Sequence, residues 1–522
     1  MLLAPYLRPH LGPFWSTYNF GKGRDIEDRI GLIIGIKKYG LPPKNPFLYH
    51  QPLNYYYFYH LDAAVLSALS KDFLSPELSH LILSGIIIIA SILLTSFFLK
   101  PLILLPLFLG YGFDFFMMIP AFFRIYPYTG KLDHVDQWVA PFVQDLKVNP
   151  FSVWFTWVPH HSLALFLSLA LVGIFFDLIK IKNEFKPAIL AFLFFAILGT
   201  SSYVFLGLLA VFFIFWLSQS LKEKKLLVKN YLFILISLPF GLILMIPTIL
   251  RINVSTISLY PFWSLPRDHL LSFKFLGLPI VVKIILLFFF LIERFLIYFL
   301  DLGLIFILAV FSWKRFPRTP FNSFVKIMFA SSILISVLLR STPNNNDLCY
   351  RISGFSWLAG AFLVNQRAEK YWRKIKKVPL LLIFLMIVLF TPTVVEQAVF
   401  PNLNFDQEFW QMKKFVDQKI PQEAVIQSPP YFEPSPFYLL EREIVYSPSG
   451  LLYYPDPKQT RKIKKDMENL FGPVKEMEVK EIVNDYRIDF ILTKTTDRFN
   501  NPAGFKKVFE NQNYLIYKTK VE

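Results

Sequence analysis

Long apolar runs constrain this chain more than any other feature. They recur between residues 80 and 397, and several are close to the roughly 20 apolar residues that a membrane-spanning helix needs. The composition fits, since 54% of the residues are hydrophobic and the mean hydropathy is +0.45. We therefore predict a polytopic α-helical membrane protein with about ten transmembrane helices. The predicted spans are 80–98, 101–123, 161–179, 187–201, 203–219, 229–249, 292–312, 323–340, 354–366 and 378–397.

Three of these regions depart from a simple span. Runs 187–201 and 354–366 are short for a bilayer, so we expect tilted or broken helices there. Run 276–312 is long enough for two spans but is interrupted by charge, which predicts a surface or half-inserted first part and then one span. The interrupting residues are Lys283, Glu293, Arg294 and Asp301.

The basic residues sort into alternate connections between the runs. The basic set holds Lys100; Lys180, Lys182, Lys186; Lys222, Lys224, Lys225, Lys229; Lys314, Arg315, Arg318, Lys326; and Arg367, Lys370, Arg373, Lys374, Lys376, Lys377. The opposite connections, 124–160, 250–275 and 340–353, are longer yet carry fewer basic residues. Because cytoplasmic loops are the basic ones, we predict a plasma-membrane protein with residues 1–79, these connections and the C-terminal tail outside.

Two further observations agree with this orientation. All eight histidines fall on the predicted outer side, with His80 and His161 at the outer ends of predicted spans. The net charge of +17 is explained by cytoplasmic loops near anionic lipid, so the predicted partner is the lipid bilayer and nucleic acid is excluded.

The chain divides into three predicted regions by composition. Residues 1–79 form a first outer loop, 80–399 the transmembrane helical domain, and 400–522 a small α/β domain outside the membrane. In the last region the helical patterns are 405–419, 458–470 and 476–485, and the strand-like runs are 424–428, 442–447, 489–493, 505–509 and 514–518. Asn511-Gln512-Asn513 predicts a hairpin turn between the last two strands.

The first outer loop carries the densest polar and aromatic pattern, in residues 21–62. Runs 25–38 and 54–70 are predicted to be amphipathic helices on the membrane surface, the second opened by the tyrosine run 55–59. The acidic residues Asp25, Glu27 and Asp28 open the first helix. They are either helix-capping residues that favour the helix dipole, or a general base that takes a proton from an acceptor hydroxyl.

A second candidate cluster lies in the predicted outer loop 341–353. Asp347 and Arg351 stand there between two spans. Arg351 is either a snorkelling side chain at the interface or the donor that grips a lipid-linked phosphate with its planar fork.

A third cluster lies in 132–161, where carboxylates and histidines alternate with tryptophans. Asp133, His134 and Asp136 have the residue types that ligate a divalent metal, and His160 and His161 follow. Interfacial polarity is the alternative for the histidines. Trp138, Trp154 and Trp157 fit an aromatic belt better than sugar stacking.

The first outer loop and two later segments resemble a known group of membrane enzymes. The sequence GLPPKNPFLYHQPLNYYYFYH (40–60), after a loop with Asp25, resembles the GT-C superfamily of membrane glycosyltransferases, and most of all its members with a Tyr-Tyr-Tyr motif. The segments NNNDLCYRISGF (344–355) and FKKVFENQNYLIYK (505–518) also resemble this group. Where those relatives often have His four residues after the Asp, this chain has Arg29. They also have a transmembrane helix before this loop; none is seen in residues 1–20, and an upstream helix would make eleven spans with the N-terminus inside.

The resemblance implies a sugar donor linked to a polyprenyl phosphate or diphosphate, and a reaction that usually inverts the anomeric centre. The resemblance also implies that Asp25 is the catalytic residue, with Asp28 and Glu27 as substitutes. It implies that Arg351 contacts the donor phosphate, with support from Asp347. Further expected substrate contacts are Tyr56, Tyr57, His60 and His160. If a divalent metal, Mg²⁺ or Mn²⁺, takes part, its candidate ligands are Asp25, Asp133 and His134.

The sequence thus predicts a cell-envelope glycosyltransferase that moves a sugar from a polyprenyl-linked donor to a glycan, lipid or protein acceptor at the outer face. The alternative is a transporter or flippase of polysaccharide or lipid-linked sugar without transfer chemistry. A third hypothesis is a non-catalytic membrane anchor that presents residues 400–522 to a partner.

Overall fold

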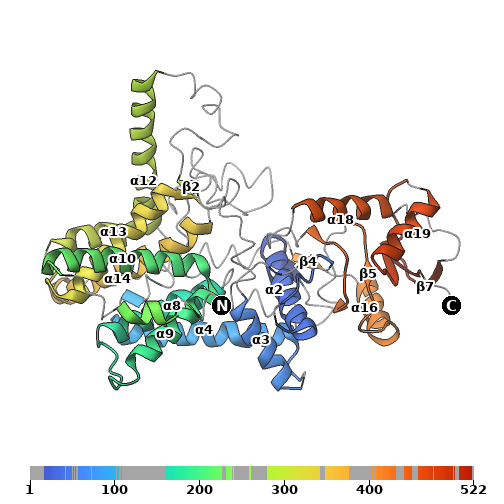
Figure 1. Ribbon diagram of the computed structural model, residues 1–522, viewed down its shortest axis with the longest axis horizontal. Coiled ribbons are helices and arrows are strands. Elements are labelled where there is room, and N and C mark those ends of the chain that lie inside the picture. Colours follow the sequence, from blue (N-terminus) through green and yellow to red (C-terminus); the bar gives the residue numbers. More distant parts are fainter. Residues whose placement is uncertain are drawn as a thin grey trace. The chain divides into compact units, whose positions relative to one another are not determined.

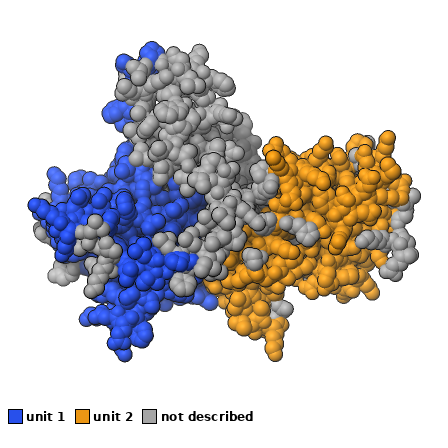
Figure 2. All heavy atoms as spheres, in the orientation of Figure 1, with its two compact units in different colours: residues 1–2, 84–245, 253–400 blue, residues 3–83, 246–252, 401–522 orange. Residues whose placement is uncertain are grey.

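The computed structural model is mostly helical, with a small sheet, and divides into two compact units (Figures 1 and 2). Unit 1 comprises residues 1–2, 84–245 and 253–400, and unit 2 comprises 3–83, 246–252 and 401–522. The structure describes residues 17–41, 43–49, 51, 53, 57–71, 73–100, 103–104, 107, 159–225, 231–237, 239, 258–259, 279–314, 316–340, 347–374, 402–404, 407–430, 440–448, 457–473, 475–497, 499 and 505–519. For some of them, including residues 17–28, it describes the backbone but not the side chain.

Unit 1 is built from apolar helices. They are α8 (Pro159–Phe175), α9 (Lys186–Thr200), α10 (Ser202–Glu223), α12 (Ile280–Trp313), α13 (Pro320–Leu338), α14 (Asp347–Lys374) and most of α4 (Pro76–Phe98), with a short pairing of β2 (Ser258–Leu259) and β3 (Leu339–Arg340). Among the described residues, three helical stretches are long and apolar enough to cross a membrane: Leu78–Phe98, Ser202–Glu223 and Pro320–Val337. These three indicate a membrane protein. The predicted runs 378–397 and most of 101–123 and 229–249 lie outside the described residues.

Aromatic side chains gather where several of these helices end or begin. The ring centroid of Phe98, at the end of α4, lies 6.0 Å from that of Phe362 of α14. The ring centroid of Phe362 in turn lies 5.5 Å from that of Phe321 of α13. Phe176, just after α8, lies 5.6 Å from Phe321 and 5.6 Å from Phe215 of α10. The end of α4, the end of α8 and the start of α13 therefore lie on the same side of unit 1.

Helix α12 differs from its sequence-based prediction. The charged residues between 283 and 301 do not end the helix, and the interruption falls at Gly303 instead. Gly303 has φ 51° and ψ −126°, a backbone conformation that glycine adopts without steric cost. Helical backbone continues on both sides of this break.

Helix α14 also corrects a prediction. The sequence placed residues 341–353 in a loop and a short span at 354–366, but one helix of 28 residues runs from Asp347 to Lys374. Asp347 and Arg351 therefore lie in its first two turns.

Unit 2 combines the first part of the chain with the last. Its N-terminal elements are β1 (Thr17–Asn19), α2 (Phe20–Tyr39), α3 (Phe58–Leu69) and the start of α4. Its C-terminal elements are β4 (Asn402–Asn404), α16 (Gln407–Lys419), β5 (Ile426–Gln427), α18 (Pro457–Leu470), α19 (Glu476–Asp485), β6 (Phe490–Lys494), β7 (Lys506–Glu510) and β8 (Tyr514–Lys518). Strand β1 pairs with β4 across nearly the whole chain.

The four-stranded sheet of unit 2 has the order β5-β6-β8-β7. Strands β5 and β6 are parallel, joined through α18 and α19, and the other neighbours are antiparallel. The predicted turn at 511–513 is confirmed, because Oδ1 of Asn511 accepts hydrogen bonds from the backbone N–H groups of Asn513 (3.1 Å) and Tyr514 (2.8 Å). The predicted strand 442–447 is wrong: that segment makes only isolated bridges, Glu443 with Val425 and Tyr446 with Leu48.

A buried amide fastens this irregular segment to the sheet. The side chain of Gln427 accepts hydrogen bonds from the backbone N–H groups of Val445 (2.9 Å) and Tyr446 (3.0 Å), and donates to the Tyr446 carbonyl (3.0 Å). The Tyr49 N–H in turn donates to the Val445 carbonyl (2.9 Å). The segment around Tyr49, which precedes the tyrosine run 55–59, is thereby joined to the C-terminal elements of unit 2.

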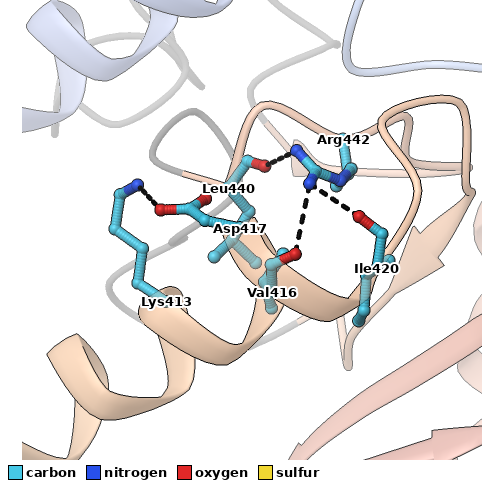
Figure 3. A network of polar contacts seen from close by, with 6 residues as sticks. All are labelled: Lys413, Val416, Asp417, Ile420, Leu440 and Arg442. Atoms are coloured by element: carbon cyan, nitrogen blue, oxygen red, sulfur yellow. Dashed lines mark hydrogen bonds and ion pairs between the residues drawn. The ribbon is translucent and has the colours of Figure 1, made fainter.

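Arg442 supplies the end of α16 with a cap. Its guanidinium donates to the carbonyl oxygens of Val416 (3.2 Å) and Ile420 (2.8 Å), and to that of Leu440 (2.9 Å) (Figure 3). The last carbonyls of a helix have no intrahelical donor and carry the negative end of its dipole, so a cation is favoured there.

The two helices predicted to lie on the membrane surface differ. From residue 29 to 36, α2 is buried or nearly so on every side, and Ile30 packs with Phe409 and Met412 of α16 while Ile33 packs with Phe47. A helix enclosed in this way does not lie on a membrane, so that prediction is wrong for α2. Helix α3 buries one face and exposes Val65 (46%) and Leu69 (79%), followed by Phe73 (85%), as an interfacial helix would.

Candidate functional site

A buried polar cluster in unit 2 joins α2, α3 and the start of α4. Arg29 of α2 is buried, and His60 of α3 is fully buried near it. Tyr59 lies next to His60, with ring centroids 5.2 Å apart, and its hydroxyl forms a 2.8 Å hydrogen bond with Nδ1 of His80. Histidine and arginine are rarely buried without a structural or binding role.

Two glycines of α2 allow the turn at residues 45–47 to pack closely against this helix. An added Cβ on Gly31 would lie 2.4 Å from the Phe47 ring, and one on Gly35 would lie 3.1 Å from Pro46. Asn45 holds this turn, because its Oδ1 accepts a hydrogen bond from the Phe47 N–H (3.0 Å). The PKNPF segment of the resemblance is thus a turn fitted against a smooth face of α2.

The charge state of the cluster follows from its burial. Burial, and then the nearby positive charge of Arg29, lower the pKa of His60 to about 3. His60 is therefore a neutral imidazole at neutral pH, and Arg29 carries the positive charge. Such a pair offers one cation and one neutral hydrogen-bonding ring, which suits anionic or hydroxyl-bearing groups.

Asp25 stands four residues before Arg29 on α2, which places the two backbone positions about one turn apart on one side of the helix. The helix begins at Phe20, and no acidic residue lies in its first turn. The interpretation of Asp25, Glu27 and Asp28 as helix-capping residues is therefore wrong. Their side chains are not among those that the structure describes.

A second buried polar cluster lies in unit 1. Nδ1 of His161, in the first turn of α8, lies 2.7 Å from Oγ of Ser201, which also accepts a hydrogen bond from the Val204 N–H and so caps α10. The ring of His160 is tilted against that of His161 with ring centroids 4.1 Å apart, and both residues are buried.

Arg351 belongs to the same region of unit 1. An added Cβ on Gly207 of α10 would lie only 2.8 Å from Ile352 and 3.2 Å from Phe355, so α10 and α14 are in close contact beside Arg351. Arg351 is itself buried. A guanidinium near the N-terminus of a helix adds to the positive end of the dipole, which makes the position suited to a phosphate.

The predicted site residues thus separate into three groups. His60 and Tyr57 are buried in unit 2, and His160 and Arg351 in unit 1. For Asp25, Glu27, Asp28 and Asp347 the structure gives the backbone alone. Tyr56, Asp133 and His134 lie outside the described residues. Where side chains are described, no group of three His, Cys, Asp or Glu is close enough to hold a metal ion, and the proposed ligands are not among them.

The sequence did not single out Tyr59, His80 or Ser201 as site residues. Tyr59 and His80 are 21 residues apart on two helices, and His161 and Ser201 are 40 residues apart. No local spacing signals such pairs. The one available signal was that every histidine falls on the predicted outer side.

Comparison with known proteins adds no identity: no protein-family model and no curated protein matches this sequence.

Proposed function

We propose that this chain is a GT-C-type membrane glycosyltransferase, with about ten transmembrane helices and its chemistry at the outer face. Its donor would be a sugar on a polyprenyl phosphate or diphosphate. The observation that carries the proposal is Arg351, a buried guanidinium in the first turns of α14, near the positive end of the helix dipole. The planar guanidinium matches the oxygens of a lipid-linked phosphate, which is the ligand proposed for it.

In the proposed reaction Asp25 takes the proton from the acceptor hydroxyl or amide. The acceptor atom then forms a bond to the anomeric carbon while the bond from that carbon to the phosphate oxygen breaks. The polyprenyl phosphate leaves with the electron pair and carries the negative charge. Acceptor and leaving group on opposite faces of the sugar would invert the anomeric centre.

Two features besides Arg351 support this assignment. The stretch 21–62, where the resemblance is densest, packs into one unit with the segment 505–518 that also carries it. Asp25 is about one helical turn from Arg29, whose place in the related proteins is often taken by His.

The alternative function, transport of lipid-linked sugar or polysaccharide without transfer, has one observation in its favour. Helix α12 is broken at Gly303, and discontinuous helices are common at the binding sites of transporters. The glycosyltransferase is preferred because a broken helix alone does not explain the buried basic residues.

The decisive experiment reconstitutes the full-length protein in proteoliposomes and supplies a panel of polyprenyl-phosphate and polyprenyl-diphosphate sugars. Release of the free polyprenyl phosphate measures transfer. Asp25→Asn is expected to lower kcat by about 100-fold or more while donor binding survives. Arg351→Gln is expected to weaken donor binding by about 10- to 100-fold.

Asp177→Asn is the matched control, because Asp177 is an exposed acid just after α8 that is paired with Lys186 at 2.5 Å. It should leave both measurements unchanged. Transfer that persists in Asp25→Asn at the wild-type rate would reject the proposed base, and translocation without release of polyprenyl phosphate would favour the transporter.

A further inference from the structure

Helix α18 of unit 2 presents an unbroken line of positive charge. Lys458, Arg461, Lys462 and Lys465 follow the spacing i, i+3, i+4, i+7, which places them on one side of the helix. All four are exposed. These four residues are called the basic stripe below. It extends about 10 Å along the helix axis.

The opposite side of α18 is fixed in the protein core. Ile463, Met467 and Leu470 are buried there, packed with the sheet and with Val479 of α19. Because this apolar side is occupied by protein, α18 cannot insert into a membrane as a free amphipathic helix would. Its basic side is exposed to solvent.

The acidic residues of α18 border the basic stripe, Asp466 four residues after Lys462 and Glu468 three residues after Lys465, and each has another partner. Glu468 pairs with Lys464, 3.7 Å away, and Asp466 accepts a hydrogen bond from the Tyr486 hydroxyl (2.7 Å). Lys464 itself is off the basic stripe, nearer the buried side. The same helix thus carries four aligned, exposed cations with two carboxylates beside them.

We propose that the basic stripe of α18 docks unit 2 onto the anionic phospholipid headgroups of the bilayer. Charge complementarity identifies the occupant as a dense anionic surface. Continuity of the chain selects lipid, since unit 2 contains the start of α4, whose Leu78–Phe98 segment is long and apolar enough to enter a membrane. Unit 2 is therefore tethered close to headgroups, where each Lys or Arg strengthens attraction about fivefold.

The test uses the full-length protein in lipid nanodiscs, one set of phosphatidylcholine alone and one with about a third phosphatidylglycerol. A dye is attached at Gln459→Cys, an exposed position of α18, in a Cys349→Ser background that removes the only other cysteine. Energy transfer to an acceptor on the lipid headgroups reports how close α18 is to the bilayer. We expect higher transfer with phosphatidylglycerol, and loss of that increase as salt is raised from 50 to 500 mM, since these surface charges are screened.

Four glutamines in place of the basic stripe (K458Q, R461Q, K462Q and K465Q) should abolish the phosphatidylglycerol response, whereas Lys464→Gln should retain it. Arginine at the three lysines should also retain it, because the attraction is one of charge. An unchanged circular dichroism spectrum confirms that the glutamine variant folds.

Two results would overturn the proposal: equal transfer in both lipid compositions, or a phosphatidylglycerol response that survives removal of the basic stripe. Binding of a soluble polyphosphate by the basic stripe, without any response to lipid, would assign it to a polyanionic polymer instead. Neither readout depends on sugar transfer, so this inference and the proposed glycosyltransferase activity fail or stand separately.

Discussion

Helices α2 and α3 come from one short stretch of sequence, and both have the pattern of a membrane-surface helix. The structure encloses α2 in protein from residue 29 to 36, whereas α3 keeps an apolar face exposed at Val65 and Leu69. Apolar spacing alone therefore does not decide whether a helix faces lipid or protein. What decides is whether distant segments of the chain supply a second apolar surface.

For α2 those segments are known. Its Ile30 packs with α16, and Leu32 and Ile33 pack with Phe47 and with Ile444 of the segment after α16. For α3 the described residues cover only the face that holds Tyr59, His60 and Ala63. The difference makes α2 the structural centre of unit 2 and leaves α3 as its apolar exterior. Each prediction below tests this difference.

The largest effect is expected from Leu32→Ala. Leu32 is buried in the core cluster of α2, so the truncation should lower the free energy of unfolding by about 3 kcal/mol through lost burial and a new cavity. Leu69→Ala, the same change on the exposed face of α3, should cost about 0.5 kcal/mol or less. Denaturant titration of the full-length protein in detergent micelles measures both. Equal losses would contradict the contrast between the two helices.

Gly31→Ala should have the next largest effect. The added methyl would lie 2.4 Å from the Phe47 ring, so the turn must move away from α2, at a cost of about 2 kcal/mol. Gly35→Ala is the matched control, since its Cβ meets Pro46 at 3.1 Å and requires only a small shift. The thermal unfolding midpoints in detergent should rank wild type, Gly35→Ala, Gly31→Ala. A reversed order of the two variants would show that α2 is not tightly packed against this turn.

The sequence predicted the local elements of unit 2 well and its long-range packing poorly. Helices 407–419, 457–470 and 476–485, and the hairpin closed by Asn511, agree with the predicted ranges because their signals are local: periodicity, charge and turn residues. The burial of α2 depends on Phe409 and Ile444, which follow it by about 380 and about 410 residues, and no local pattern encodes that contact.

The candidate site shows the same limit. The sequence pointed to His60, His160 and Arg351 as residues of interest, and each is buried among helices. It did not predict the bond between Tyr59 and His80, or that of His161 with Ser201, because the partners are far apart in the sequence. Nor did it predict that Arg29 would be buried near His60.

The buried face of α3 should make stability depend on pH through His60. In the unfolded chain this imidazole takes up a proton near pH 6.5, but in the native protein its pKa is about 3. Between these values the unfolded state binds more protons, so the free energy of unfolding falls as the pH is lowered, by about 1.4 kcal/mol per pH unit. From pH 6.5 to 5 this contribution reaches about 2 kcal/mol.

His60→Asn removes that titration. Comparing its unfolding free energy with that of wild type at pH 7, 6 and 5 isolates the contribution of His60 from other groups. The difference between the two proteins should shift steadily in favour of the variant as the pH falls. A difference that does not change with pH would mean that His60 is protonated in the native state too, and that α3 is open to water on this face.

The smallest effect tests the hydrogen bond that joins this face of α3 to α4. Tyr59→Phe removes the hydroxyl bonded to Nδ1 of His80 at 2.8 Å and leaves the buried imidazole with one partner fewer. The expected loss is about 1 kcal/mol. Tyr57→Phe is the control, because the structure shows no hydrogen bond of the Tyr57 hydroxyl to a described residue. Thermal unfolding in detergent should give a lower midpoint for Tyr59→Phe than for Tyr57→Phe. If the two midpoints coincide, packing of the Tyr59 ring and not its hydroxyl holds α3 to α4. The inner face of α3 would then resemble the apolar core around α2.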